Sequence, residues 1–103
     1  MVTPRQGEIW WVEAGDKRRP VLVVSRSQAV AVLNRVVCAP ITRTIRGIPT
    51  EIALNEANGL REPCVASFDN LQLVRKSSLA KRVGALANPR RHICTALGAL
   101  ADC

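Results

Sequence analysis

The sequence predicts a small α+β or mainly β barrel with a helix at its C-terminal end. Its 103 residues suffice for one domain, expected to span residues 1–103. Hydrophobic residues make up 48% of the chain and aromatic residues only 3%, so aliphatic side chains must fill the core, as in thin β-rich domains. Short apolar runs separated by turn-forming residues occupy most of the chain, and helical spacing appears near its end.

The first two strands are expected to form a hairpin. Residues 7–14 mix β-branched and aromatic side chains, and residues 20–25 form a continuous apolar run suited to a strand buried on both faces. Residues 15–19 contain a Gly-Asp pair flanked by charges, which predicts the turn between them. Pro20 is tolerated at the first position of the second strand.

Further strands are expected at residues 35–42, 50–54, 64–68, 70–74 and 82–86. Pro40 lies inside the first of these, which predicts an edge strand or a bulge there. Residues 27–34 fit a helical turn or an excursion, and residues 55–63 are rich in Asn, Gly and Glu and predict a surface loop. Residues 75–79 predict a turn that opens a brief helix.

A C-terminal helix is predicted from the Asn-Pro pair at residues 88–89. Asn caps free amides at a helix start, and Pro is accepted at the first helical position. Apolar residues then recur at helical spacing, at Ile93, Ala96, Leu97 and Leu100.

The charge balance predicts a polyanionic partner. Fifteen Lys and Arg face eight Asp and Glu, a formal charge of +7, and only three of the fifteen are lysines. The planar guanidinium group of Arg fits phosphate oxygens bidentately, and a net positive charge accelerates and strengthens nucleic-acid binding. A generally basic surface without a specific partner is the alternative.

Cysteine and histidine usage argues against a metal site, so no metal and no cofactor are expected. The four cysteines are widely separated, and His92 is the only histidine. Neither a leader nor an apolar run of about 18 residues occurs, so no membrane association is expected. Free thiols in the cytoplasm are the simplest interpretation.

The residue types available for catalysis are limited. The acidic residues show no clustered pair of the kind that holds two metal ions, and one histidine does not supply two-imidazole chemistry. Arg, Thr and Ser remain, which position and neutralise a phosphate, and an RNA substrate carries its own nucleophile in the 2′-hydroxyl. From these residues alone, RNA binding and RNA cleavage stay equally open.

Four segments together cover nearly the whole chain: RQGEIWWVEAG, RRPVLVVS, VVCAPITRTIRGIPTEIAL and FDNLQLVRKSSLAKRVGAL. In order and spacing they resemble the MazF/PemK family of toxin endoribonucleases from bacterial toxin-antitoxin pairs. The resemblance implies a small SH3-like (CcdB/PemK-type) antiparallel barrel and a homodimer. It also implies metal-independent cleavage of single-stranded RNA at short sequences, with 2′,3′-cyclic phosphate and 5′-hydroxyl ends.

The same resemblance identifies the site residues by position. Arg19, just before Pro-Val, and Thr42, at the end of the Ala-Pro-Ile-Thr segment, are the expected catalytic residues. The expected RNA-binding residues are Lys17, Arg18, Arg43, Arg46, Asp69 and Asn70. The family's proposed mechanism gives the arginine a proton-transfer role, but a guanidinium stays protonated at ordinary pH, so charge stabilisation is the better assignment.

The implied partners are RNA, a second copy of the chain and a cognate antitoxin. An acidic antitoxin segment is expected to lie across the RNA groove and compete for its arginines. Whether the RNA is messenger, ribosomal or transfer RNA stays open, and the short turn at residues 14–18 prevents transfer of a relative's base preference.

Two alternatives from other classes stay open. One is a CcdB-like toxin that poisons gyrase, but those toxins depend on a Trp-Gly-Ile-type C-terminus, whereas both tryptophans here are in the first strand. The other is a noncatalytic RNA-binding barrel, which needs exposed aromatic platforms. Phe68, Trp10 and Trp11 are the only aromatic residues, and of the adjacent tryptophans one is expected to point inward and one outward.

Overall fold

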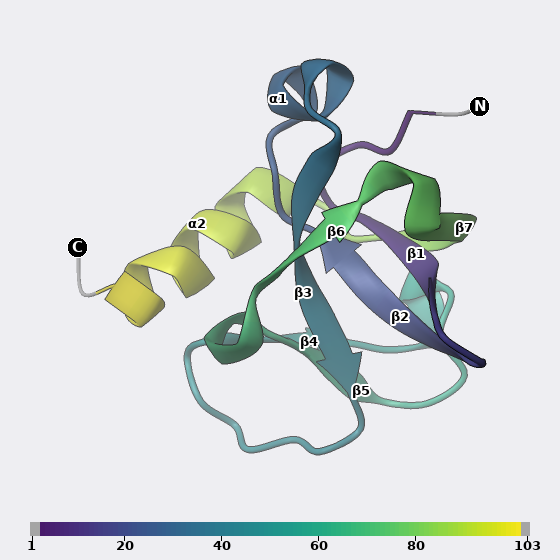
Figure 1. Cartoon of the computed structure of the whole chain (residues 1–103). Helices are drawn as coiled ribbons and strands as arrows, with labels where there is room; N and C mark the ends of the chain where they lie inside the picture. The colour runs from purple at the N-terminus through teal and green to yellow at the C-terminus, as the bar shows by residue number, and fades with distance from the viewer. Residues whose placement is uncertain (1–2, 102–103) are drawn as a thin grey trace.

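A seven-stranded antiparallel sheet dominates the computed structural model, which describes residues 3–101 (Figure 1). The strands are β1 (Glu8–Ala14), β2 (Lys17–Val23), β3 (Arg35–Thr42), β4 (Glu51–Leu54), β5 (Cys64–Ser67), β6 (Gln72–Arg75) and β7 (Leu79–Ala85). Their order is β4-β5-β3-β2-β1-β7, and β6 pairs with β3 outside this path. The helices are α1 (Ser27–Val32), α2 (Pro89–Ala101) and three 3₁₀ helices, η1 (Glu56–Asn58), η2 (Phe68–Asn70) and η3 (Lys76–Ser78). The expected fold class is confirmed.

The hairpin of β1 and β2 has a shorter turn than expected. Ala14 pairs with Lys17, so only Gly15 and Asp16 form the turn, and Gly15 has a φ of +67°. The prediction of a turn over residues 15–19 is therefore wrong in extent, because the second strand already begins at Lys17. Two-residue turns with positive φ match the twist of paired strands, which lets the ladder continue to the tip.

Pro40 lies inside the sheet, and the expectation of an edge strand there is wrong. One side of β3 pairs with β2, and the other side pairs with β6 through residues 35–38 and with β5 through residues 41–42. Pro40 falls between the last two segments, where neither neighbour needs its missing N–H group.

The sheet buries apolar side chains on both faces. The first cluster includes Ile9 and Leu22 of the sheet and Ile93 of α2, and the second includes Trp10, Val21 and Val30 of α1. Figure 1 shows α2 along one side of the sheet and α1 at one end of it. Alternating strand residues therefore serve two cores, which explains the continuous apolar run in β2.

The start of α2 is fixed against the beginning of the chain. The Gly7 carbonyl accepts the Leu86 N–H at 2.8 Å, and a Cβ at Gly7 would overlap Pro89, so only glycine permits this approach. Asn88, with a φ of +51°, accepts the His92 N–H through its carbonyl at 3.4 Å. The predicted helix start is thus confirmed.

No helix in residues 3–101 has the length and apolarity needed to cross a membrane.

Candidate functional site

A groove of about 830 Å³ opens where β2 and β3 separate. The last pair between these strands is Val21 with Pro40. Hydrogen-bonded and non-hydrogen-bonded pairs alternate in an antiparallel ladder, and the Val24 N–H donates to Val37, so the next hydrogen-bonded pair beyond Val21 and Pro40 would be Pro20 with Ile41. Pro20 lacks the N–H that this pair needs, and it therefore ends the ladder at this point. The lining residues are Trp11, Arg18, Arg19, Pro20, Ile41, Thr42, Arg43, Gly59, Leu60, Arg61, Glu62, Cys64 and Val83.

Both predicted catalytic residues line this groove. Arg19 and Thr42 each lie two residues beyond Val21 and Pro40, the last pair of the β2–β3 ladder, one on each side of the opening. The fold thus brings together two residues that are 23 positions apart in the chain.

Thr42 is held so that its hydroxyl proton remains available. Its Oγ1 atom accepts the backbone N–H of Thr44 at 3.1 Å. A hydroxyl has two acceptor lone pairs and one donor, and this contact uses only an acceptor. The Thr42 O–H can therefore donate to an oxygen atom of a bound group.

The loop that follows Thr42 is held by a carboxylate at its far end. Glu51 Oε1 accepts the backbone N–H groups of Arg46 and Gly47, each at 3.0 Å. Its other oxygen, Oε2, is buried without a hydrogen-bond partner within the described residues. Thr42 and Glu51 thus fix residues 43–50 from both ends.

Four arginines and one glutamate line the groove, which makes it strongly positive. Arg18 pairs with Glu13 at 3.1 Å and Arg43 pairs with Glu62 at 3.3 Å, in each case with both side chains more than half exposed. Such exposed pairs contribute about 0–1 kcal/mol, so a phosphate can replace either carboxylate. Arg19 and Arg61 have no ion-pair partner among residues 3–101.

The other predicted RNA-binding residues lie outside the groove lining, namely Lys17, Arg46, Asp69 and Asn70. Lys17 is at the hairpin tip, and Arg46 is in the loop held by Glu51. Asp69 Oδ2 accepts the hydroxyl of buried Thr50 at 2.6 Å, and the Asn70 amide donates to Ser67 Oγ at 3.0 Å. The Asp69 and Asn70 side chains therefore stabilise the corner around η2.

One wall of the groove has no counterpart among the residues predicted from the sequence. Arg61 and Glu62 come from residues 55–63, which were expected to be only a surface loop. The nearest signal is the Asn55 and Asn58 pair before Gly59, which forms a capping box around η1. The tryptophans divide as expected, because Trp10 is buried in the second core while half-buried Trp11 lines the groove.

The two buried cysteines are poor nucleophiles. Burial raises the pKa of the Cys64 thiol, and the nearby Glu62 carboxylate raises it further. Burial also raises the pKa of Cys38 to about 12. A thiol reacts as the thiolate, so Cys64 lines the groove as an apolar wall.

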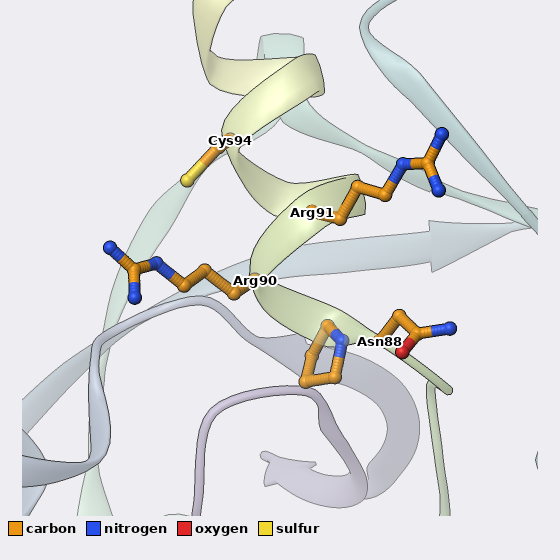
Figure 2. A pocket seen from close by; sticks show the side chains of 5 residues that line it. Asn88, Arg90, Arg91 and Cys94 are labelled. Atoms are coloured by element: carbon orange, nitrogen blue, oxygen red, sulfur yellow. The ribbon is translucent and has the colours of Figure 1, made fainter.

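A second, shallower hollow of about 450 Å³ lies at the start of α2. Figure 2 shows the guanidinium groups of Arg90 and Arg91 on opposite sides of the helix, with Cys94 one turn further on. These cations do not converge on one point, so the hollow lacks the arrangement of the main groove. Within residues 3–101, His, Cys, Asp and Glu form no cluster of three that suits a metal ion.

Taken together, the fold and the groove define a small basic β-barrel protein with an arginine-lined groove between two strand ends. The sequence profile of the PemK-like, MazF-like toxins of type II toxin-antitoxin systems matches residues 5–97. The chain belongs to this family.

Sequence relatives agree with this assignment. A Mycobacterium tuberculosis protein described as a probable endoribonuclease, MazF5, is 40% identical over 97% of this chain and 94% of its own length. Endoribonuclease MazF3 from the same species is 39% identical over 81% of this chain and 82% of its own length.

Solved structures share the fold. The Mycobacterium tuberculosis toxin MazF-mt6 superposes with a TM-score of 0.82 at 36% identity, covering 92% of this chain and 96% of its own. A mycobacterial endoribonuclease in complex with its cognate antitoxin superposes with a TM-score of 0.80 at 28% identity, covering 95% of each chain.

Proposed function

We propose that this protein is a toxin endoribonuclease, one domain that cleaves single-stranded RNA at short specific sequences without a metal ion. The observation that carries the proposal is the meeting of Arg19 and Thr42 in a groove lined by four arginines. Membership of the toxin family supports the same activity, since relatives over nearly the full chain are named endoribonucleases. The products are RNA ends with a 2′,3′-cyclic phosphate and a 5′-hydroxyl.

The groups in the groove suit cleavage by the substrate's own 2′-hydroxyl. The 2′-oxygen attacks the adjacent phosphorus and releases its proton to solvent. The bond between phosphorus and the 5′-oxygen then breaks, and the 5′-oxygen takes up a proton. Negative charge increases on the phosphoryl oxygens in the transition state, where Arg19 neutralises it and the Thr42 hydroxyl donates a hydrogen bond. Neither group needs to be deprotonated, which suits a guanidinium.

Two protein partners belong to the proposal. A cognate antitoxin silences the enzyme by laying an acidic segment across the groove, where its carboxylates displace Glu13 and Glu62 from the arginines. The active species is a homodimer in the cytoplasm, where both RNA and antitoxin are present. Support for the antitoxin comes from the related endoribonuclease solved with its cognate antitoxin.

The test is cleavage of a long unstructured RNA in the presence of EDTA. Wild type is compared with Arg19→Ala, Thr42→Ala and the control Arg35→Ala, because Arg35 is exposed at the opposite end of β3. Mapping of the product ends identifies the chemistry, and circular dichroism checks that each variant is folded.

We expect discrete cuts with 5′-hydroxyl ends from wild type and the control, and a loss of at least about 100-fold for each groove variant, as for the removal of one transition-state donor. Intact RNA with the wild-type protein, or equal cleavage by folded Arg19→Ala and Thr42→Ala, would contradict the proposal.

A further inference from the structure

We infer that residues 59–62 form a second, rigid wall of the RNA groove, on which Arg61 binds a backbone phosphate and Glu62 opposes binding. This inference rests on the proposed function and names a phosphate-binding residue that lies outside the predicted set. Three observations carry it: the position of the wall, its rigidity and the charges that it presents.

Side chain-to-backbone hydrogen bonds hold the segment that leads into the wall. The Asn55 side chain accepts the Ala57 N–H at 2.9 Å, and the Asn58 side chain accepts the Asn55 N–H at 3.0 Å, which closes a capping box around η1. The Asn58 amide also donates to the Ala85 carbonyl of β7 at 3.1 Å. The segment before Arg61 is therefore tied both to itself and to the sheet.

Two glycines bring this segment directly against β7. Gly59 has a φ of +89°, and a Cβ on it would overlap the Val83 carbonyl. A Cβ on Gly84 would in turn overlap the Asn58 carbonyl. Backbone packs on backbone here, which only glycine permits. A cation just beyond such a contact is presented with less loss of chain entropy on binding than a cation on a mobile loop.

The charges on the wall differ in a way that predicts opposite effects. Arg61 is exposed and has no ion-pair partner among residues 3–101, so its guanidinium reaches a phosphate without breaking an existing contact. Glu62 holds Arg43 at 3.3 Å and is the only acidic residue among the described residues that line the groove. A phosphate that binds Arg43 must displace Glu62 and then lies beside an unpaired carboxylate. Removing that carboxylate should therefore strengthen RNA binding.

The test is equilibrium binding of a 2′-O-methyl oligonucleotide that spans a mapped cleavage site, measured over a series of salt concentrations. The 2′-O-methyl group blocks cleavage, so binding is read separately from catalysis. The variants are Arg61→Ala, Arg61→Lys and Glu62→Gln. Arg35→Ala is the control, since Arg35 begins β3 and is seven residues, or roughly 23 Å of strand, from Thr42.

We expect Arg61→Ala to weaken binding about tenfold and to reduce the slope of log affinity against log salt by about 0.7, the value for one phosphate contact on a single strand. Arg61→Lys should recover most of the affinity, because it keeps the charge. Glu62→Gln should bind a few-fold more tightly than wild type, and Arg35→Ala should match wild type.

The inference would be overturned if the affinity of Arg61→Ala for the oligonucleotide stayed within about twofold of wild type and its salt slope were unchanged. It would also be overturned by a Glu62→Gln variant that binds as weakly as Arg61→Ala, because damage to the wall and not lost charge would then explain both. A wild-type protein that cleaves RNA while Arg61→Ala binds normally refutes this inference alone. A wild type that cleaves no RNA refutes the proposed function instead.

Discussion

Replacement of Glu51 by alanine should release the loop that follows Thr42. In the native protein Glu51 Oε1 accepts the N–H groups of Arg46 and Gly47, each at 3.0 Å. Alanine has no acceptor, so both amides would have to bind water. Glutamine keeps a side-chain oxygen in the same place and is the matched control.

The expected loss in the free energy of unfolding for Glu51→Ala follows from the number and exposure of these hydrogen bonds. A single intramolecular hydrogen bond contributes about 0.5–1.5 kcal/mol net, so two contribute about 1–3 kcal/mol. The loop is exposed and water can reach the released amides, which places the expected loss near the lower half of that range, about 1–2 kcal/mol. For a domain of this size the midpoint of thermal unfolding should fall by roughly 4–16 °C.

Glu51→Gln should cost less than about 1 kcal/mol. Its oxygen can accept both amides, and its NH₂ group would occupy the position of Oε2, an atom that already has no partner in the described structure. The substitution therefore removes no hydrogen bond at the position of Oε2.

The assays are urea unfolding at fixed protein concentration, followed by tryptophan fluorescence, and single-turnover RNA cleavage. We expect Glu51→Ala to lower both the free energy of unfolding and the cleavage rate, and Glu51→Gln to stay near wild type in both. Equal stability and equal cleavage for Glu51→Ala and wild type would refute the reasoning, since the loop would then be held by other contacts.

Three further predictions concern Cys38, Gly84 and Pro20. Because burial raises the Cys38 pKa from 9.0 to about 12, unfolding releases a thiol proton above pH 9, so the free energy of unfolding should fall between pH 9 and 12 by up to about 4 kcal/mol. Parallel pH profiles for wild type and Cys38→Val would contradict this. Gly84→Ala should force the Asn58 carbonyl away and cost about 1–3 kcal/mol, measured by urea unfolding, while also weakening RNA binding; unchanged values in both assays would contradict it. Pro20→Val restores the N–H that a hydrogen-bonded pair with Ile41 needs. The backbone amide of residue 20 should then exchange slowly with solvent, and RNA cleavage should fall because the groove narrows. A fast-exchanging amide at residue 20 would contradict this prediction.

Local patterns in the sequence predicted most of the strands and the terminal helix. Apolar runs, the Gly-Asp pair and the Asn-Pro pair each depend on neighbouring residues, and the structure has an element at each of those positions. The errors arose where pairing decides the outcome. Pro40 lacks a backbone N–H, which suits an edge strand. The gap between the segments of β3 that pair with β6 and β5 also leaves this N–H without a partner to serve, and no local pattern distinguishes an edge from such a gap.

The candidate site was only partly accessible to the same reasoning. Arg19 and Thr42 were identified through their motifs, whereas their meeting in one groove depends on the β2–β3 register. Arg61 lies in a polar loop whose composition is typical of solvent-exposed segments. Its place in the groove depends on the close contact between Gly59 and Gly84, two residues that are far apart in the chain.

The Arg19-Pro20 pair links the architecture of the groove to its chemistry. Pro20 lacks the donor that would extend the β2–β3 ladder, so the strands separate immediately beyond Val21. Arg19 is the next residue along β2, and it therefore sits at the edge of the opening while its backbone remains paired with Val12 of β1. A rigid strand thus holds the guanidinium, and the neighbouring proline leaves space for the substrate. Under the proposed function, Arg18 and Arg19 therefore bind phosphate from the first residues of β2, and their position at the strand end gives the substrate access to them.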